Sequence, residues 1–239
     1  MASDALFFGA HPDDIELSCG GLAALLAKHG HAVALADLTR GEMGTRGDVE
    51  VRAREAAAAA KALGAAVRDN LGLPDGGLDR HDRAQLAAVV ECLRRHRPSL
   101  VVAPHADDPH PDHVETSHLV TRACYLAGLT KYPAGGERWR PARLLYVLYR
   151  GAVPPTLVVD ITSVWDARVA AVRAHVSQLD PAAGESTYLT ATGFLAEVEA
   201  RARVHGAAAG GMYGEGYVSR GPLALRDARA LLAPPENPS

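Results

Sequence analysis

The chain has 239 residues, of which 48% are hydrophobic and 22% charged, so it can bury the core of one large α/β domain and is not a disordered tail. Its formal net charge of −3 and pI near 6.4 argue against nucleic-acid binding, which usually requires a basic surface. No stretch approaches the roughly 18 apolar residues of a membrane span, and the N-terminus lacks the features of a secretory signal. The three cysteines are odd in number and far apart, so we expect a cytoplasmic protein without a disulfide framework.

Hydrophobic periodicity predicts alternating strands and helices. Strands are expected at 5–10, 31–39, 66–73, 99–104, 143–151 and 155–162. Helices are expected at 19–30, 49–64, 83–98, 163–179 and 194–210, and 110–129 is either a helix or a loop leading into one. This alternation predicts a Rossmann-like α/β fold with a mostly parallel sheet and helices on both faces. No linker or repeat is visible, so residues 1–239 are expected to form a single domain, with 233–239 frayed.

The segment "HPDD" at 11–14 places charge directly after the first predicted strand. Ligands of open parallel sheets bind at the carboxyl ends of the strands. His11 and Asp14 could bind one metal ion there, and Asp13 could accept a proton from water that the ion has acidified. Taken alone, the tetrapeptide is more simply a turn, because proline fixes φ and aspartate favours loops and helix N-termini.

A second cluster, "HPDH" at 110–113, follows the fourth predicted strand. Either His110 or His113 could supply the third metal ligand, while the other faces the substrate, oriented and kept cationic by a carboxylate such as Asp112. The spacing does not decide between the two histidines. Two such clusters at one edge of the sheet favour a metal site over two unrelated turns, and zinc or ferrous iron would accept two histidines and an aspartate.

Arg46 and Arg52 flank the end of a glycine-bearing loop, "GEMGTRG" at 41–47. They could clamp substrate oxygens, although solvated surface arginines would show the same pattern. The glycines suggest that loop 41–52 acts as a lid. A dinucleotide-binding oxidoreductase would have G-x-G-x-x-G after the first strand, where this chain has "GAHPDD", and two carboxylates would repel a pyrophosphate.

The segments "AHPDDIE" (10–16) and "HPDH" (110–113) together resemble the LmbE/PIG-L family of metal-dependent N-deacetylases. Further segments resemble the bacillithiol biosynthesis deacetylases, so the resemblance extends to about Leu225; they are 37–47, 70–76, 110–132, 213–217 and 220–225. The resemblance implies the LmbE/PIG-L fold and a homo-oligomer, either a hexamer or a trimer.

The resemblance also implies roles for individual residues. The implied zinc ligands are His11, Asp14 and His113. The implied reaction groups are Asp13 as general base, His110 as oxyanion stabiliser and proton donor to the amine, Asp112 as the carboxylate that orients His110, and Arg52 as a partner of a sugar hydroxyl. Pro109 departs from relatives that carry an arginine there, and the tyrosine that assists the oxyanion in some relatives has no obvious counterpart among Tyr188, Tyr213 and Tyr217.

By resemblance, the expected activity is removal of acetyl from an N-acetylglucosamine (GlcNAc) conjugate, first of all N-acetyl-α-D-glucosaminyl L-malate in bacillithiol biosynthesis. The expected partner is therefore a small sugar conjugate, with neither nucleic acid nor membrane. Two alternatives remain open: a deacetylase or amidase of another GlcNAc or thiol conjugate, of the mycothiol or chitobiose type, and a non-catalytic sugar-binding protein on the same fold.

Overall fold

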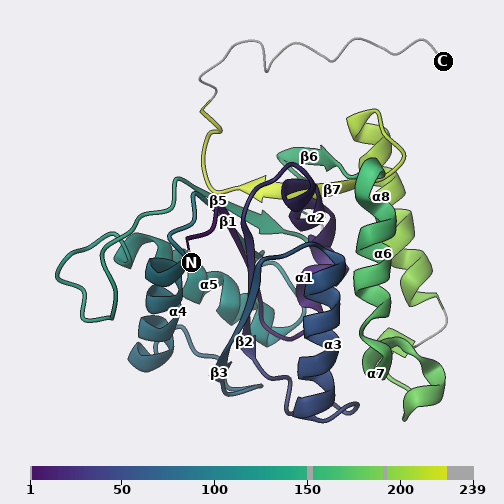
Figure 1. The fold of residues 1–239 in the computed structure, drawn as a ribbon, viewed down its shortest axis with the longest axis horizontal. Helices are drawn as coiled ribbons and strands as arrows, with labels where there is room; N and C mark the ends of the chain where they lie inside the picture. The colour runs from purple at the N-terminus through teal and green to yellow at the C-terminus, as the bar shows by residue number, and fades with distance from the viewer. Residues whose placement is uncertain (1, 150–152, 191–192, 225–239) are drawn as a thin grey trace.

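Seven strands form one sheet in the computed structural model, which describes residues 2–149, 153–190 and 193–224 (Figure 1). The strands are β1 Ala5–Gly9, β2 Val33–Thr39, β3 Val67–Leu73, β4 Leu100–Pro104, β5 Arg143–Val147, β6 Leu157–Asp160 and β7 Gly214–Ser219. Their order is β3-β2-β1-β4-β5-β7-β6; β1 to β5 are parallel, and β7 is antiparallel to both β5 and β6. The predicted mostly parallel α/β fold is confirmed.

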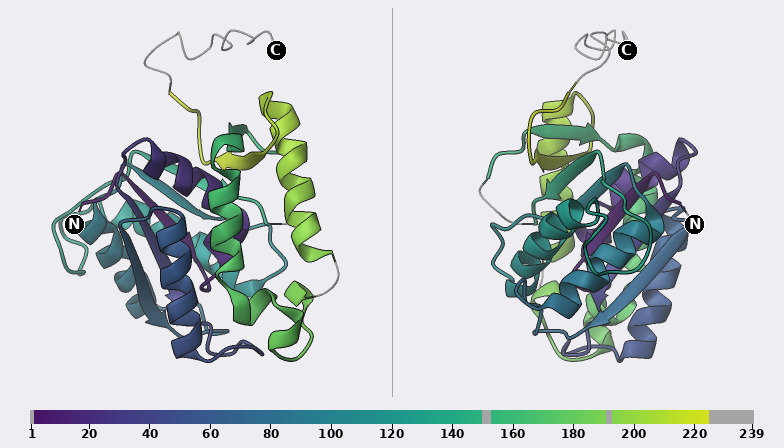
Figure 2. Two further views of the ribbon diagram at one scale, coloured as in Figure 1. Left: turned by 45° about the vertical axis from the view of Figure 1, so that its right-hand side comes forward. Right: turned by 90° about the vertical axis from the view of Figure 1, so that its left-hand side faces the viewer.

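Helices cover both faces of this sheet (Figure 2). They are α1 Asp14–Ser18, α2 Gly20–Lys28, α3 Val49–Ala62, α4 Arg83–His96, α5 Pro111–Leu126, α6 Trp165–Arg173, α7 Val176–Leu179 and α8 Phe194–Ala209. Short 3₁₀ turns are η1 Thr162–Val164, η2 Pro181–Ala183 and η3 Tyr188–Thr190. None of the helices in the described part of the chain is long and apolar enough to cross a membrane.

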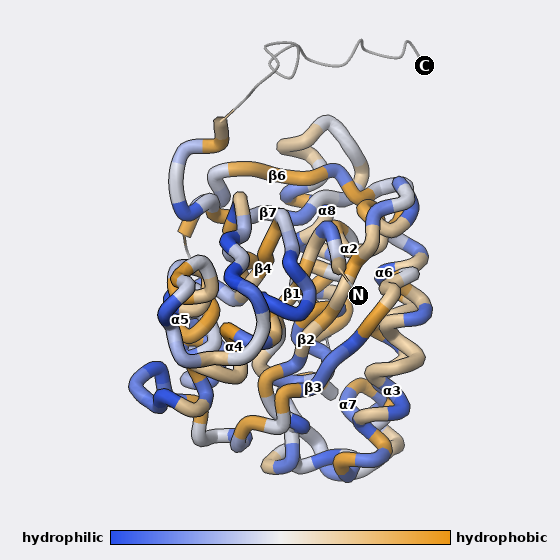
Figure 3. The backbone as a smooth tube through the Cα atoms, turned by 60° about the vertical axis from the view of Figure 1, so that its left-hand side comes forward, coloured by the Kyte–Doolittle hydropathy of each residue, from blue (hydrophilic) through white to orange (hydrophobic). Residues whose placement is uncertain are grey.

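The strands are apolar on both faces because each face has its own core. Phe7 of β1 packs in a cluster with residues of α2 and α3, whereas the adjacent Phe8 packs in a second cluster with residues of α4 and α5. Successive side chains of a strand point to opposite faces, so neighbouring residues enter different cores. In Figure 3, β6 is apolar along most of its length, whereas the edge strand β3 carries a hydrophilic stretch just after its first residue.

The last strand was not predicted. The segment of β7 has no alternating apolar pattern because Gly214, Glu215 and Gly216 begin it. Close packing requires glycine at the start of this strand: a Cβ at Gly214 would lie 2.7 Å from the backbone carbonyl carbon of His205 on α8. Tertiary packing, rather than strand propensity, therefore decides the conformation of this segment.

The single helix expected at 163–179 is wrong. The chain instead forms η1, α6 and α7, and it bends at His175, whose Nε2 atom lies 3.4 Å from Oε2 of the buried Glu16. The strand expected at 143–151 ends at Val147. Its last two residues, together with the expected frayed tail at 233–239, lie outside the described residues.

Candidate metal centre

The "HPDD" segment is a tight turn between β1 and α1. The backbone N–H of His11 donates a 2.7 Å hydrogen bond to Oδ2 of Asp14, which fixes that carboxylate beneath the turn. Asp13 has φ 135° and ψ −24°, a conformation that residues other than glycine rarely adopt. Such strain persists only where the surroundings impose it, and it occurs preferentially at functional sites.

The "HPDH" segment begins helix α5. His110 precedes the first turn, and its Nδ1 atom accepts a hydrogen bond of 3.2 Å from the backbone N–H of Asp112. Pro111 occupies the first turn, where its missing N–H has no helical partner to lose. His113 is therefore placed in the first turn of α5, facing the "HPDD" turn.

The side chains of His11, Asp14 and His113 converge as predicted. Their ligand atoms all lie within 4.8 Å of one another. Nε2 of His113 is 3.2 Å from Oδ1 of Asp14, and Nδ1 of His11 is 3.4 Å from Oδ2 of Asp14. Two imidazoles and one carboxylate, converging in a cavity, are the donor set of a catalytic divalent-metal site with an open position. The residues present therefore fit a metal ion.

Further carboxylates orient the two histidines. Nδ1 of His113 is 2.9 Å from Oδ1 of Asp108, which leaves Nε2 directed at Asp14. Nε2 of His11 is 3.0 Å from Oδ1 of Asp75 and 3.2 Å from Oδ2 of Asp112. Carboxylates on the outer nitrogens of metal-binding histidines fix the ring orientation and raise ligand basicity.

The electrostatics of the cluster favour a cation. Burial alone would lower the pKa of His11, but hydrogen bonds with Asp112, Asp14 and Asp75 raise it to about 12. Burial likewise opposes protonation of His113, yet Asp14 and Asp108 raise its pKa to about 10. Conversely, His113 and His11 hold the pKa of Asp14 well below its usual range despite its burial. The carboxylates therefore favour binding of a positive charge at the cluster of His11, Asp14 and His113.

Asp13 lies beside the cluster and is 5% exposed. Burial raises its pKa to about 6, although the Arg52 guanidinium, with Nη2 at 3.5 Å from Oδ2, acts in the opposite direction. A carboxylate whose pKa is close to neutrality is suited to accept a proton.

His110 is exposed at the cavity, and its ring centroid lies 4.9 Å from that of His11. Burial, followed by the neighbouring His113 and His11, lowers its pKa, so the neutral imidazole is favoured. The expected partner carboxylate points elsewhere: Oδ2 of Asp112 accepts a 2.8 Å hydrogen bond from the backbone N–H of Gly76 and contacts His11. Orientation of His110 by Asp112 stays a prediction.

Arg52 reaches the cavity, whereas Arg46 does not line it within the described part of the chain. Arg52 is buried and donates from Nη1 to the carbonyl oxygen of Gly41 (3.0 Å) and from Nη2 to that of Pro12 (2.8 Å). It therefore ties loop 41–47 to the "HPDD" turn. Arg46 is also buried, and its Nη2 atom donates to the carbonyl oxygen of Asp180.

Of the tyrosines considered from the sequence, Tyr188 lines the cavity. Tyr213 stacks on Trp165 with a centroid distance of 4.0 Å, and the Tyr217 hydroxyl donates to Glu215, so both belong to the packing around β7.

Sequence reasoning missed Asp75, Asp108 and Tyr149. The first two follow β3 and β4, so their position after predicted strands was the available signal. Tyr149 stacks against His113 with a centroid distance of 4.5 Å, and no motif indicated it.

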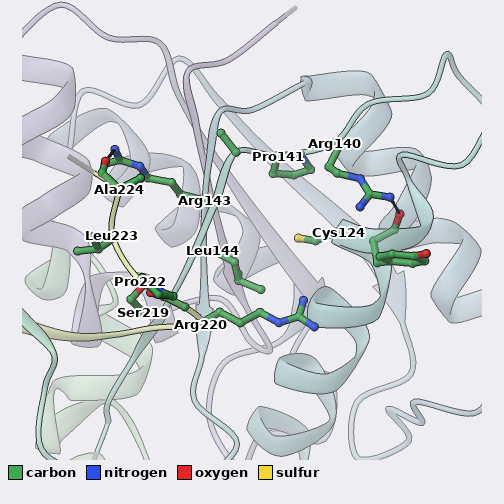
Figure 4. Close-up of a pocket in the computed structure, with 13 residues that line it drawn as sticks. Cys124, Arg140, Pro141, Arg143, Leu144, Ser219, Arg220, Pro222, Leu223 and Ala224 are labelled. Atoms are coloured by element: carbon green, nitrogen blue, oxygen red, sulfur yellow. Dashed lines mark hydrogen bonds between the residues drawn. The ribbon is translucent and has the colours of Figure 1, made fainter. Parts of the chain in front are cut away.

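The cavity above the cluster has a volume of about 600 Å³. It contains all three candidate ligands together with Asp13, His110 and Asp112, and an apolar wall faces them. A second cavity, of about 360 Å³, lies at the amino end of β5 (Figure 4). Its described lining includes Arg140, Arg143 and Arg220 but neither histidine nor carboxylate, so its charged side chains are all cationic.

The fold and the cluster define a class of protein: an α/β protein that carries a candidate metal site of two histidines and one carboxylate at the carboxyl edge of its sheet, with a buried aspartate beside it. Comparison with known proteins narrows this class. Residues 6–124 match the family model described as PIG-L: GlcNAc-PI de-N-acetylase. The conserved protein TT1542 from Thermus thermophilus has a crystal structure that superposes with a TM-score of 0.85 at 39% identity, covering 93% of this chain and 97% of that one.

Three curated relatives have more specific names. A 1D-myo-inositol 2-acetamido-2-deoxy-alpha-D-glucopyranoside deacetylase of Rhodococcus jostii is 29% identical, over 77% of this chain and 84% of the relative. A 4-oxalmesaconate hydratase of Pseudomonas putida is 31% identical, over 73% of each chain. The diacetylchitobiose deacetylase of Thermococcus kodakarensis is 32% identical, over 70% of this chain and 67% of the relative. The chain belongs to the LmbE/PIG-L family of de-N-acetylases.

Proposed function

We propose that this protein is a metal-dependent hydrolase that removes the acetyl group from the nitrogen of a GlcNAc conjugate. The observation that carries the proposal is the convergence of His11, Asp14 and His113, with the buried carboxylate of Asp13 beside them. A non-catalytic sugar-binding protein would not require a base next to a complete ligand set.

The proposed metal is zinc, held by His11, Asp14 and His113, and ferrous iron would accept the same ligands. When bound, the metal supplies a Lewis acid that acidifies water and polarises the amide carbonyl. Asp13 takes a proton from the attacking water while the water oxygen forms a bond to the carbonyl carbon. The C–N bond then breaks, the amine nitrogen takes up a proton, and acetate leaves.

His110 is placed to act on the reacting amide. Its Nδ1 atom is occupied by the backbone N–H of Asp112, so Nε2 is the nitrogen left to face a substrate. From Nε2 the neutral imidazole can donate a hydrogen bond to the carbonyl oxygen as negative charge develops there. The proton that the leaving amine takes up is then the one that Asp13 removed from water. We propose Arg52 as a partner of a sugar hydroxyl, because it lines the cavity beside Asp13.

The identity of the conjugate is the finer part of the proposal. Two relatives are named as deacetylases of GlcNAc compounds other than the malate conjugate, so their names favour a different GlcNAc conjugate over that of malate. Hydration is a second candidate reaction, because a relative of comparable identity is named a hydratase. Adding water to a double bond would use the same cation and base.

The test is release of free amine from N-acetylglucosaminyl inositol, diacetylchitobiose and N-acetylglucosaminyl malate by zinc-loaded protein. Hydration of 4-oxalmesaconate is followed in parallel. Asp13→Ala is compared with Asp166→Ala, which removes an exposed aspartate of α6. Amine release that is lost only in Asp13→Ala supports the proposal. Hydration without amine release would replace it, and activity retained in Asp13→Ala would remove the assigned base.

A further inference from the structure

The cavity above His11, Asp14 and His113 is lined by apolar side chains in one part and by carboxylates in another. This difference bears on which group could be attached to the sugar of the conjugate. From it we infer that the substrate is a GlcNAc glycoside whose aglycone is uncharged and apolar, such as an alkyl or aryl group. This inference rests on the proposed deacetylase function.

One wall of the cavity is apolar from the metal ligands to the mouth. Tyr149 stacks against His113, and it packs in one cluster with Leu17, Leu189 and Phe194. Tyr188 continues the wall outward: its ring lies edge-on to that of Phe194, with centroids 5.6 Å apart, and the residue is 52% exposed. All five side chains line the cavity beside the carboxylate floor.

The loop after β2 adds another apolar group to the lining of the cavity. Met43, in the loop after β2, lines the cavity and is 73% exposed. Its position is fixed, because its backbone N–H donates a 2.8 Å hydrogen bond to Oδ2 of Asp75, which itself contacts His11. A methionine exposed at a cavity mouth is an adaptable apolar contact surface.

Charge on the cavity disfavours an anionic aglycone. The described lining includes five carboxylates, those of Asp13, Asp14, Asp75, Asp108 and Asp112. Neighbouring carboxylates partly offset the charge of the two guanidinium groups of this lining: Arg52 lies 3.5 Å from Asp13, and Arg201 lies 4.0 Å from Glu197. Even with a divalent cation bound, negative charge remains in excess, so a dicarboxylate such as malate would be repelled.

The carboxylate-rich part and the apolar part of the cavity lining thus suit different parts of a substrate. The polar floor suits the acetamido group and sugar hydroxyls, whereas the wall of Leu17, Tyr149, Tyr188, Leu189 and Phe194 would exclude water from an apolar substituent. Burying apolar surface favours binding in proportion to the area removed from water. A volume of about 600 Å³ lies within the usual range for small-molecule sites.

The experiment compares kcat/KM for amine release from methyl, octyl and phenyl N-acetylglucosaminides and from N-acetylglucosaminyl malate, with zinc-loaded protein. We expect the octyl and phenyl glycosides to exceed the methyl glycoside by about tenfold or more. The malate conjugate is expected to fall below the methyl glycoside. Higher ionic strength should narrow the malate deficit, because it screens charge.

Variants locate the effect on the wall. Tyr188→Ser and Leu189→Ser are expected to lower the octyl-to-methyl ratio several-fold. The matched control is Leu195→Ser, which removes an exposed leucine on the neighbouring turn of α8 that is not part of the described cavity lining. It should leave the ratio unchanged.

The outcomes separate the inference from the function on which it rests. Deacetylation in which malate is preferred, or in which octyl and methyl glycosides react equally, overturns the apolar-aglycone inference and leaves the deacetylase proposal standing. An octyl preference that Leu195→Ser abolishes as fully as Tyr188→Ser does overturns the assigned wall. Absence of amine release from all four compounds overturns the apolar-aglycone inference, and the deacetylase proposal falls with it only if N-acetylglucosaminyl inositol and diacetylchitobiose also release no amine.

Discussion

At the residue scale, the unusual backbone of Asp13 and its chemical role have a common origin. The Asp13 carboxylate interacts electrostatically with both Asp14 and Arg52. Arg52 also donates a hydrogen bond to the carbonyl oxygen of Pro12, the residue before Asp13. We expect Asp13→Asn to fold normally, because asparagine tolerates positive φ better than most residues. It cannot accept the proton, so kcat should fall by about 100-fold to 10,000-fold.

The measurement is kcat for amine release, together with a circular dichroism melt to establish folding. Asp166→Asn, which alters an exposed aspartate, serves as the control and should retain full activity. A folded, zinc-loaded Asp13→Asn protein with a kcat within a few-fold of the original would contradict the assignment.

Asp108 supports the metal centre through His113. Because its Oδ1 atom is the partner of Nδ1 of His113, Asp108→Asn should weaken zinc binding by about 10-fold to 100-fold. Competition against a chromophoric chelator measures this affinity. Asp107→Asn, an exposed neighbour in the same loop, is the control, and equal zinc affinities for the two variants would show that Asp108 does not orient the ligand.

The sequence located the candidate ligands better than the residues that contact them. His11, Asp14 and His113 stand in short motifs after strands, so local spacing was enough to bring them to one edge of the sheet. Asp75 and Tyr149 act through contacts between segments far apart in the chain, which no local pattern encodes. Arg46 shows the converse error: it sits in a suggestive loop, yet folding turns it toward Asp180.

At the element scale, β7 anchors the helix that follows the metal-binding turn. The buried carboxylate of Glu215 accepts hydrogen bonds of 2.7 Å from the backbone N–H groups of Gly21 and Leu22, at the start of α2. Gly21 is required there, because a Cβ would lie 2.7 Å from Oε1 of Glu215 and 2.6 Å from Cδ1 of Ile161. The negative charge of Glu215 at the N-terminus of α2 is stabilising. Nε of Arg168 lies 3.3 Å from Oε1 of Glu215.

Glu215→Gln is therefore expected to lower the free energy of unfolding by about 1–3 kcal/mol, because an amide can accept only one of the two N–H bonds and leaves buried donors unpaired. Urea denaturation measures this change. Glu137→Gln is the control, since its side chain is 87% exposed and should alter stability by less than about 0.5 kcal/mol. Equal stability of the two variants would show that the cap contributes nothing measurable.

The same strand shows why sequence reasoning failed for this part of the fold. The parallel strands are short apolar runs that hydrophobicity alone indicates, but β7 begins with glycines that are needed for the close approach of α8. The interruption of the helix at His175 also depends on contacts that the local sequence does not reveal. The sequence 163–179 has helical periodicity throughout, and only the buried contact between His175 and Glu16 accompanies the bend.

At the scale of the whole molecule, the candidate metal centre lies where the order of the strands reverses. From β1 the chain builds outward to β2 and β3 on one side, and then returns to place β4 and β5 on the other. The crevice at such a reversal is the usual ligand site of open α/β sheets. The motifs at 11–14 and 110–113 follow β1 and β4, the two strands on either side of that reversal.

This position makes metal binding a link between two halves of the molecule, because His11 and Asp14 follow β1 whereas His113 belongs to α5. Removing metal with a chelator should abolish amine release and lower Tm, because the clustered carboxylates lose their cation. Zinc restored at 100 times its Kd should return about 2.7 kcal/mol of stability. His113→Ala should show no such zinc-dependent rise in Tm, whereas His81→Ala, which removes an exposed histidine, should show it in full. A metal-free protein with unchanged activity and Tm would exclude this cluster as a metal centre.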